Sequence, residues 1–208
     1  DLVAEGQLPE EASFLAIGRR GLSEEEYRNQ ARESIKEHSR TQVIEEHLAR
    51  FLDKLQYHQM EFISQPDSYK GFKERLEGIE QGFSKPAIRI FFLAVGPEHF
   101  SPIVTHLSEH HLVKRGDINH RVMIEKPFGS DLESARVLNA TLSTALLERQ
   151  VYRIDQYLGK EMIRNILALR FGNSLFEPLW NHHYIDNIQI TSTEVLGVEG
   201  RGGYYEQA

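Results

Sequence analysis

The sequence contains no cysteine among its 208 residues, which excludes disulfide bonds and thiolate metal sites. No apolar run approaches the roughly eighteen residues of a membrane-spanning helix, and no secretory signal is present. Basic residues are outnumbered: the net charge is −7, and without a basic block a nucleic-acid surface is not expected. With 40% hydrophobic and 26% charged residues, the composition favours a cytoplasmic globular protein without a membrane or nucleic-acid partner.

Metal-ligand patterns are also scarce in the first part of the chain. His38, His47 and His58 are scattered, and no pair of histidines is spaced for one helix face there. We therefore expect surface or core histidines and no metal site. The chain begins with Asp1 rather than methionine, so we also expect that its natural start is missing.

Apolar runs and helical periodicity alternate along the chain. Within the run at 87–95, residues 90–94 are apolar on both faces, as a central parallel strand covered by helices should be. Ser23 and Glu26 have the spacing of a helix capping box. We predict strands at 13–18, 55–62, 87–95, 121–125 and 151–154, and helices at 23–38, 41–52, 66–78, 100–111 and 131–147. This order indicates the α/β class, with a mostly parallel sheet and right-handed crossovers.

The pattern changes after residue 170. Residues 184–195 alternate between apolar and polar side chains, which predicts one long antiparallel strand. Long alternating strands rarely occur singly, so we expect the chain to enter a second domain there.

Polar side chains follow the strand predicted at 151–154. Asp155, Gln156, Tyr157 and Lys160 come next, immediately before a helical pattern. Tyr157 and Lys160 beside free backbone N–H groups suit a phosphate, and Asp155 suits holding a cation or orienting a histidine. An ordinary helix cap at Asp155 with a solvated Lys160 explains the same residues.

Two further strand ends carry cations. Lys126 follows the strand at 121–125 and is restricted by Pro127, so it is expected to point into a ligand crevice. Arg19 and Arg20 follow the first predicted strand and could hold a phosphate by forked hydrogen bonds. Alternatively, Lys126 lies in solvent where the strand leads into a loop, and Arg19 and Arg20 are solvated loop residues that bind no ligand.

Four motifs together resemble the glucose-6-phosphate dehydrogenase family. They are RIDQYLGKE at 153–161, EKPFG at 125–129, LRFGN at 169–173 and EGRGGY at 199–204. The resemblance extends over essentially the whole chain but covers only part of the family's usual length. We therefore expect a sequence truncated at both ends.

The resemblance implies oxidation of glucose 6-phosphate at C1 to 6-phosphogluconolactone, with hydride transfer to NADP, the first step of the oxidative pentose phosphate pathway. It implies a partial Rossmann-like NADP-binding domain at 1–154. Residues 155–208 would begin an α+β substrate and oligomerisation domain with a large antiparallel sheet. A homo-oligomer is implied for the full-length protein.

The resemblance also assigns roles to individual residues. Lys126 and Asp155 would be catalytic, with Lys126 at the reactive end of the sugar and the nicotinamide, and Asp155 orienting a histidine. The substrate-binding residues would be Lys126, Gln156, Tyr157, Lys160 and Glu194. The cofactor-binding residues would be Arg19, Arg20, Lys126 and Pro127.

Three features depart from the family pattern. Gln156 replaces the histidine of the usual RIDHYLGKE motif, which keeps a hydrogen-bond donor but not a charge. The glycine-rich dinucleotide turn and the first strand that precedes it are not in the sequence. None of the ten histidines matches the catalytic histidine, which we expect beyond Ala208.

These departures leave three hypotheses. In the first, the chain is part of an NADP-dependent glucose-6-phosphate dehydrogenase and is inactive by itself. The second is a catalytically dead remnant that at most binds a sugar phosphate. The third is a related Rossmann-type oxidoreductase that acts on an unphosphorylated sugar.

Overall fold

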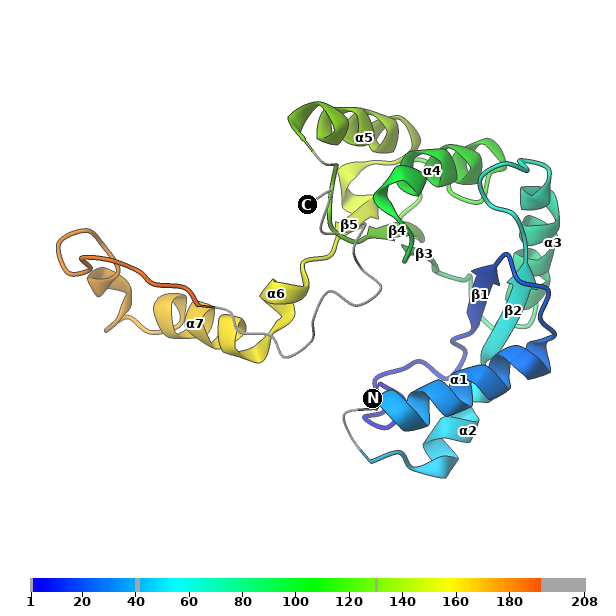
Figure 1. The fold of residues 1–208 in the computed structure, drawn as a ribbon, viewed down its shortest axis with the longest axis horizontal. Coiled ribbons are helices and arrows are strands. Elements are labelled where there is room, and N and C mark those ends of the chain that lie inside the picture. Colours follow the sequence, from blue (N-terminus) through cyan, green and yellow to red (C-terminus); the bar gives the residue numbers. More distant parts are fainter. Residues whose placement is uncertain (1, 40–41, 130, 192–208) are drawn as a thin grey trace.

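A computed structural model of the protein describes residues 2–39, 42–129 and 131–191 (Figure 1). Every strand pairing in these residues is parallel, and the strands form two ladders, β1–β2 and β3–β4–β5. The strands are β1 (Phe14–Gly18), β2 (Leu55–Gln59), β3 (Arg89–Leu93), β4 (His120–Ile124) and β5 (Val151–Arg153). The α/β class with a mostly parallel sheet, predicted from the sequence, is confirmed.

Helices connect and follow the strands. The α-helices are α1 (Glu24–His38), α2 (Glu45–Asp53), α3 (Ser68–Glu80), α4 (Phe100–Glu109), α5 (Leu132–Ala145), α6 (Gln156–Gly159) and α7 (Glu161–Phe171). Short 3-10 turns are η1 (Pro97–His99), η2 (Glu148–Gln150) and η3 (Glu177–Leu179). None of the helices in the described ranges is both long and apolar enough to cross a bilayer.

The α1 helix begins at the capping box that the sequence predicts. The Ser23 hydroxyl accepts a hydrogen bond from the Glu26 N–H at 3.2 Å, and the Glu26 carboxylate accepts one from the Ser23 N–H at 2.8 Å. These bonds satisfy backbone N–H groups that have no partner inside the helix. The helix then packs beside β2, where Tyr27 stacks on Tyr57 with ring centroids 4.8 Å apart.

Most element boundaries lie within two residues of the prediction, and two differ by more. The strand predicted to reach Phe62 ends at Gln59, because the Met60 N–H donates to the carbonyl of Gly18, the last residue of β1. Beyond that bond, no strand among the described residues pairs with β2. The helix predicted to begin at Thr41, which lies outside the described residues, begins at Glu45.

One hydrophobic core lies against one face of the β3–β4–β5 ladder. Val122 and Ile124 of β4 are fully buried, together with Val104 of α4 and Leu142 of α5. Side chains of successive residues alternate between the faces of a strand, so Phe91 and Leu93 of β3 join the same layer. The helices α3, α4 and α5 bury this face.

The other face of the same ladder is exposed. Ile90 and Phe92 of β3 are 54% and 52% exposed, and Tyr152 of β5 is 44% exposed. The sequence-based expectation that β3 is a central strand covered on both faces is therefore wrong for the described residues. A run that is apolar on both faces indicates that both faces of the strand can be buried. The position of the strand in the sheet depends on segments that are distant in the sequence.

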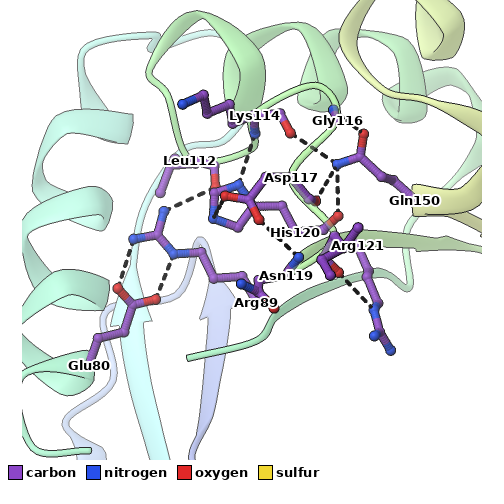
Figure 2. Close-up of polar contacts among 11 residues, drawn as sticks. Glu80, Arg89, Leu112, Lys114, Gly116, Asp117, Asn119, His120, Arg121 and Gln150 are labelled. Carbon is purple, nitrogen blue, oxygen red and sulfur yellow. Dashed lines mark hydrogen bonds and ion pairs between the residues drawn. The ribbon is translucent and has the colours of Figure 1, made fainter. Parts of the chain in front are cut away.

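A buried glutamine fixes the amino-terminal edge of this ladder (Figure 2). Gln150 is fully buried directly before β5, and its amide nitrogen donates to the carbonyls of Lys114, Asp117 and His120 at 2.8–3.0 Å. Its amide oxygen accepts from the backbone N–H groups of Gly116 and Leu147 at 2.7 and 3.0 Å. One side chain thus contacts five backbone groups around the turns before β4 and β5, with its two N–H donors shared among three carbonyls.

Arg89, the first residue of β3, closes the same edge. Its guanidinium forms a forked pair with Glu80 of α3 at 2.6 and 2.8 Å and donates to the Leu112 carbonyl at 3.1 Å (Figure 2). The carboxylate raises the pKa of Arg89 above its usual value, because it stabilises the charged guanidinium. A forked ion pair and a backbone hydrogen bond therefore hold the first residue of β3 in place.

The segment after β5 departs from the prediction. In Figure 1, α6 and α7 extend away from the ladders as an arm, and α7 has no buried residue. Residues 184–191 contain no strand, although a strand was predicted at 184–195; residues 192–195 lie outside the described residues. A strand needs a neighbour for its backbone hydrogen bonds, and the described part of the arm offers none.

Candidate functional site

The register of β4 and β5 determines where the two most suggestive charged side chains meet. Ile124 pairs with Arg153, and the Ile154 N–H donates to the Ile124 carbonyl at 2.8 Å as the chains leave the ladder. Lys126 and Asp155 each lie two residues beyond that matched pair. Both therefore leave adjacent parallel strands at the carboxyl edge, where open α/β sheets bind ligands.

The structure joins these two side chains directly. The Lys126 ammonium donates to the Asp155 carboxylate at 2.5 Å, with side chains 48% and 24% exposed. A pair this accessible to solvent contributes at most about 1 kcal/mol to stability. The ion pair instead orients the Lys126 side chain, because the carboxylate holds the ammonium at the strand ends. The ammonium has further N–H donors that can bind a ligand.

The loop that carries Lys126 is anchored on its far side. The Lys126–Pro127 peptide bond is cis, and Phe128 packs against the main core. Gly129 has φ +92°, and a Cβ there would lie 2.6 Å from the backbone nitrogen of Ala135 in α5. Asp131 then caps α5 with its side chain. The motif at 125–129 thus has a structural explanation for its aromatic residue and its glycine.

The segment after Asp155 forms the short helix α6. Gln156 and Tyr157 lie in its first turn, and Lys160 lies at the N-cap position of α7 with extended backbone angles. Lys160 is exposed. The junction is therefore a strand, one helical turn and a second helix start within ten residues, which presents new backbone N–H groups beside Asp155.

The arginine pair follows β1 as predicted. The carbonyl of Arg20 accepts from the Tyr57 hydroxyl at 2.6 Å, and that of Arg19 accepts from the Gln59 amide at 3.2 Å. A Cβ on Gly18 would meet the Tyr57 hydroxyl at 2.6 Å, so a larger residue there would require Tyr57 to shift. The backbone is fixed while both residues remain exposed. This arrangement suits an anion that arrives from solvent.

The predicted site residues do not all come together. Lys126 and Asp155 touch each other, whereas Arg19 and Arg20 lie on the other ladder. Glu194 lies outside the described residues. A cavity of ≈ 540 Å³ runs along α7 and is lined by Glu161, Met162, Asn165, Ile166 and Leu169, without Lys126 or Asp155. The described residues contain no cluster of three or more acidic or imidazole side chains suited to a metal ion.

Sequence reasoning allowed Asp155 to hold a cation or orient a histidine, but it did not name Lys126 as the partner of Asp155. The signal was available in the strand register, because both residues stand two positions beyond paired strand ends. That register becomes visible only once β4 and β5 are known to be neighbours.

Known proteins similar to this chain come from one family. Residues 1–165 match the model for the glucose-6-phosphate dehydrogenase NAD-binding domain, and 167–208 match the C-terminal domain of the same family. The glucose-6-phosphate 1-dehydrogenase of Rhizobium meliloti is 41% identical over 98% of this chain, and that of Bacillus subtilis is 41% identical over 100%. The chain spans 40% and 41% of the lengths of these two relatives.

Solved structures are similar as well. A glucose-6-phosphate dehydrogenase in complex with glucose 6-phosphate superposes with a TM-score of 0.84 at 34% identity, over 99% of this chain and 42% of that one. The enzyme from Mycobacterium avium gives a TM-score of 0.78 at 30% identity, over 99% of this chain and 42% of that one. With two family models covering nearly every residue, this chain belongs to the glucose-6-phosphate dehydrogenase family.

Proposed function

We propose that this chain supplies sugar-phosphate-binding residues for the oxidation of glucose 6-phosphate at C1, with hydride transfer to NADP. The contact between Lys126 and Asp155 at the ends of two adjacent parallel strands carries the proposal. The structural neighbour solved with glucose 6-phosphate supports a phosphorylated hexose as the ligand. Because the chain spans about two fifths of its relatives, the activity is proposed for the whole protein.

Lys126 and Asp155 would act on the reacting end of the sugar. Lys126 keeps one donor on Asp155 and can direct another at a sugar hydroxyl, which fixes C1 against its hydride acceptor. The C1 hydroxyl must lose its proton as the hydride leaves. Asp155 is placed to stabilise the positive charge of a base that takes this proton.

Phosphate recognition would fall to Lys160 and Tyr157, with Gln156 as a neutral donor and Glu194 on a sugar hydroxyl. Lys160 at the start of α7 places its charge beside the free N–H groups of a helix terminus, which favours an anion. Each charge-assisted hydrogen bond to a phosphate contributes roughly 1.5–3 kcal/mol.

The family model identifies a nicotinamide dinucleotide as the cofactor, and we propose the phosphorylated form, NADP. The cofactor accepts the hydride. Arg19 and Arg20 fit its additional phosphate, since both are exposed on a backbone held by Tyr57 and Gln59. Pro127 would border the nicotinamide. Replacing both arginines with alanine should weaken NADP binding at least about tenfold, the loss of one charge-assisted contact, and leave NAD binding nearly unchanged.

Calorimetric titration with glucose 6-phosphate tests the sugar site on this chain. We expect saturable binding that Lys126→Ala and Lys160→Ala each weaken roughly tenfold or more, as expected for a lost charge-assisted hydrogen bond. Lys70→Ala is the matched control, because Lys70 is an exposed lysine of α3. Glucose without phosphate should bind much more weakly than glucose 6-phosphate.

Two outcomes favour the other hypotheses. If Lys160→Ala leaves the affinity intact while glucose binds as well as its phosphate, an unphosphorylated substrate is favoured. If glucose 6-phosphate binds but a chain with the full length of its relatives makes no NADPH, a catalytically dead sugar-phosphate binder is favoured. NADPH formation by this chain itself would exclude the dead remnant.

We also propose that residues 1–154 belong to the cofactor domain and 155–208 to the substrate and oligomerisation domain. The end of β5 at Arg153 and the arm formed by α6 and α7 support this boundary. Association into a homo-oligomer is part of the same proposal for the whole protein.

A further inference from the structure

The turn that follows β1 is closed by one carbonyl. It leads from Gly18, the last residue of β1, to the start of α1. The Arg20 carbonyl accepts hydrogen bonds from the Leu22 N–H at 3.0 Å and from the Tyr57 hydroxyl at 2.6 Å. A carbonyl oxygen has two lone pairs, so these two bonds use both. The backbone of the turn is therefore tied to itself and to a side chain of β2.

The position of Tyr57 is set by elements outside this turn. The residue is 9% exposed, and its ring stacks on that of Tyr27 in α1, with 26° between the ring planes. Across the ladder, Tyr57 pairs with Ala16 of β1. The hydroxyl passes so close to Gly18 that a Cβ there would lie 2.6 Å away. The sheet and α1 thus aim the hydroxyl at the arginine turn.

The arginine side chains receive little help from the helix that follows them. Free N–H groups and the dipole at a helix N-terminus usually attract anions. At the start of α1, however, the Ser23 hydroxyl and the Glu26 carboxylate already bind backbone N–H groups, and residues 24–26 are all glutamate. An anion at this turn must therefore be held by the exposed Arg19 and Arg20 side chains, which makes the placement of their backbone decisive.

We propose that Tyr57 is a positioning residue that makes this turn selective for the 2′-phosphate that distinguishes NADP from NAD; this role rests on the proposed NADP function. The Tyr57 hydroxyl does not bind the phosphate itself. Its bond to the Arg20 carbonyl keeps the turn in one conformation, so phosphate binding does not have to order the arginine backbone. A ligand without the 2′-phosphate does not use the guanidinium groups, and its affinity is independent of the hydroxyl.

Adenosine 2′-phosphate is the probe, because it carries only the phosphate that separates the two cofactors. In calorimetric titrations, Tyr57→Phe should bind it roughly three- to tenfold more weakly than the parent, as expected for the loss of one hydrogen bond. Tyr27→Phe is the matched control, because it preserves the same ring stack and should bind the probe like the parent. Adenosine without phosphate should bind all three proteins with equal affinity.

Hydrogen exchange gives a second measurement that separates positioning from folding. The Leu22 amide, which closes the turn, should exchange at least about threefold faster in Tyr57→Phe and at the parent rate in Tyr27→Phe. The Met60 amide donates to the Gly18 carbonyl at 2.9 Å, outside the turn. It should keep the parent rate in both variants, which shows that the β1–β2 ladder is intact.

The positioning role is overturned if Tyr57→Phe binds adenosine 2′-phosphate as tightly as the parent, or if it weakens adenosine binding to the same extent. A double variant, Arg19→Ala with Arg20→Ala, separates this failure from failure of the proposed function. If the double variant loses affinity for the probe and Tyr57→Phe does not, the arginine site stands and the role of Tyr57 is wrong. If the double variant binds like the parent, or the parent does not bind, the proposed phosphate site is wrong and the role of Tyr57 falls with it.

Discussion

The ion pair between Lys126 and Asp155 is the residue-level feature on which the proposed sugar site depends. At 48% and 24% exposure its contribution to stability is small, so its value lies in holding an ammonium at the strand ends. We predict that Asp155→Asn weakens glucose 6-phosphate binding roughly three- to tenfold, because Lys126 loses its positioning partner. Calorimetry measures the affinity, with Asp67→Asn, an exposed aspartate before α3, as the control.

Charge alone predicts the opposite effect of Asp155→Asn on the affinity for glucose 6-phosphate. Removing a carboxylate from the neighbourhood of an anionic ligand reduces repulsion. A higher affinity for glucose 6-phosphate in Asp155→Asn would therefore contradict a positioning role and reduce Asp155 to a local negative charge.

The glutamine at position 156 is the second residue-level feature. The family motif carries a histidine there, and a charged imidazolium forms stronger hydrogen bonds to phosphate than a neutral amide. We predict that Gln156→His strengthens glucose 6-phosphate binding by roughly 1–3 kcal/mol at pH 6 and less at pH 8, where histidine is neutral. Titrations at both pH values measure this, and an equal affinity of variant and parent at pH 6 would refute it.

At the scale of elements, the turns before β4 and β5 depend on Gln150. Replacing it with alanine removes five hydrogen bonds to backbone groups of these turns, although the carbonyls of Lys114 and Asp117 keep a backbone N–H partner. We predict that Gln150→Ala lowers the free energy of unfolding by about 2–4 kcal/mol. Denaturant unfolding measures this, with the exposed Gln81→Ala as the control. A loss below about 0.5 kcal/mol, typical of surface positions, would show that water replaces the amide.

We expect His120, the first residue of β4, to make this edge sensitive to acid. Burial lowers the pKa of His120 below its usual value, with Arg89 and Lys114 acting in the same sense and Asp117 and Glu80 opposing. Its Nδ1 accepts a hydrogen bond from the Lys114 N–H at 2.9 Å, which requires an unprotonated nitrogen.

The sign of the pH effect follows from this shift. A histidine with a lowered folded-state pKa contributes its full stability above its unfolded pKa of about 6.5, and the contribution falls as pH decreases toward the folded pKa. We predict that His120→Asn, whose side-chain oxygen can accept the same bond, loses less stability than the parent between pH 7.5 and 5.5. Burial also lowers the pKa of His58, so His58→Asn should show a separate, additive effect. Equal pH dependence of His120→Asn and parent would contradict this assignment.

At the scale of the whole molecule, much of the fold could be predicted from sequence. Apolar runs located all five strands, and Ser23 with Glu26 located the start of α1, because these signals are local. The Lys126 and Asp155 strand ends were also identified from local pattern. The exposure of Ile90 and Phe92 was not predictable, since it depends on which strand lies beside β3.

Other features lacked a local signal altogether. Gln150 is one polar residue among many, and its five hydrogen bonds come from turns more than thirty residues away as well as from its own. The absence of a strand at 184–191 has the same origin, because alternation predicts a strand only where a partner is present.

The central claim is that a phosphorylated hexose binds at the carboxyl ends of β4 and β5. A glucose 6-phosphate titration followed by amide chemical shifts in NMR tests its location directly. The account predicts saturable shifts confined to residues 125–129 and 153–161, reduced in Lys126→Ala. Shifts confined to the cavity along α7, or none at saturating glucose 6-phosphate, would contradict it.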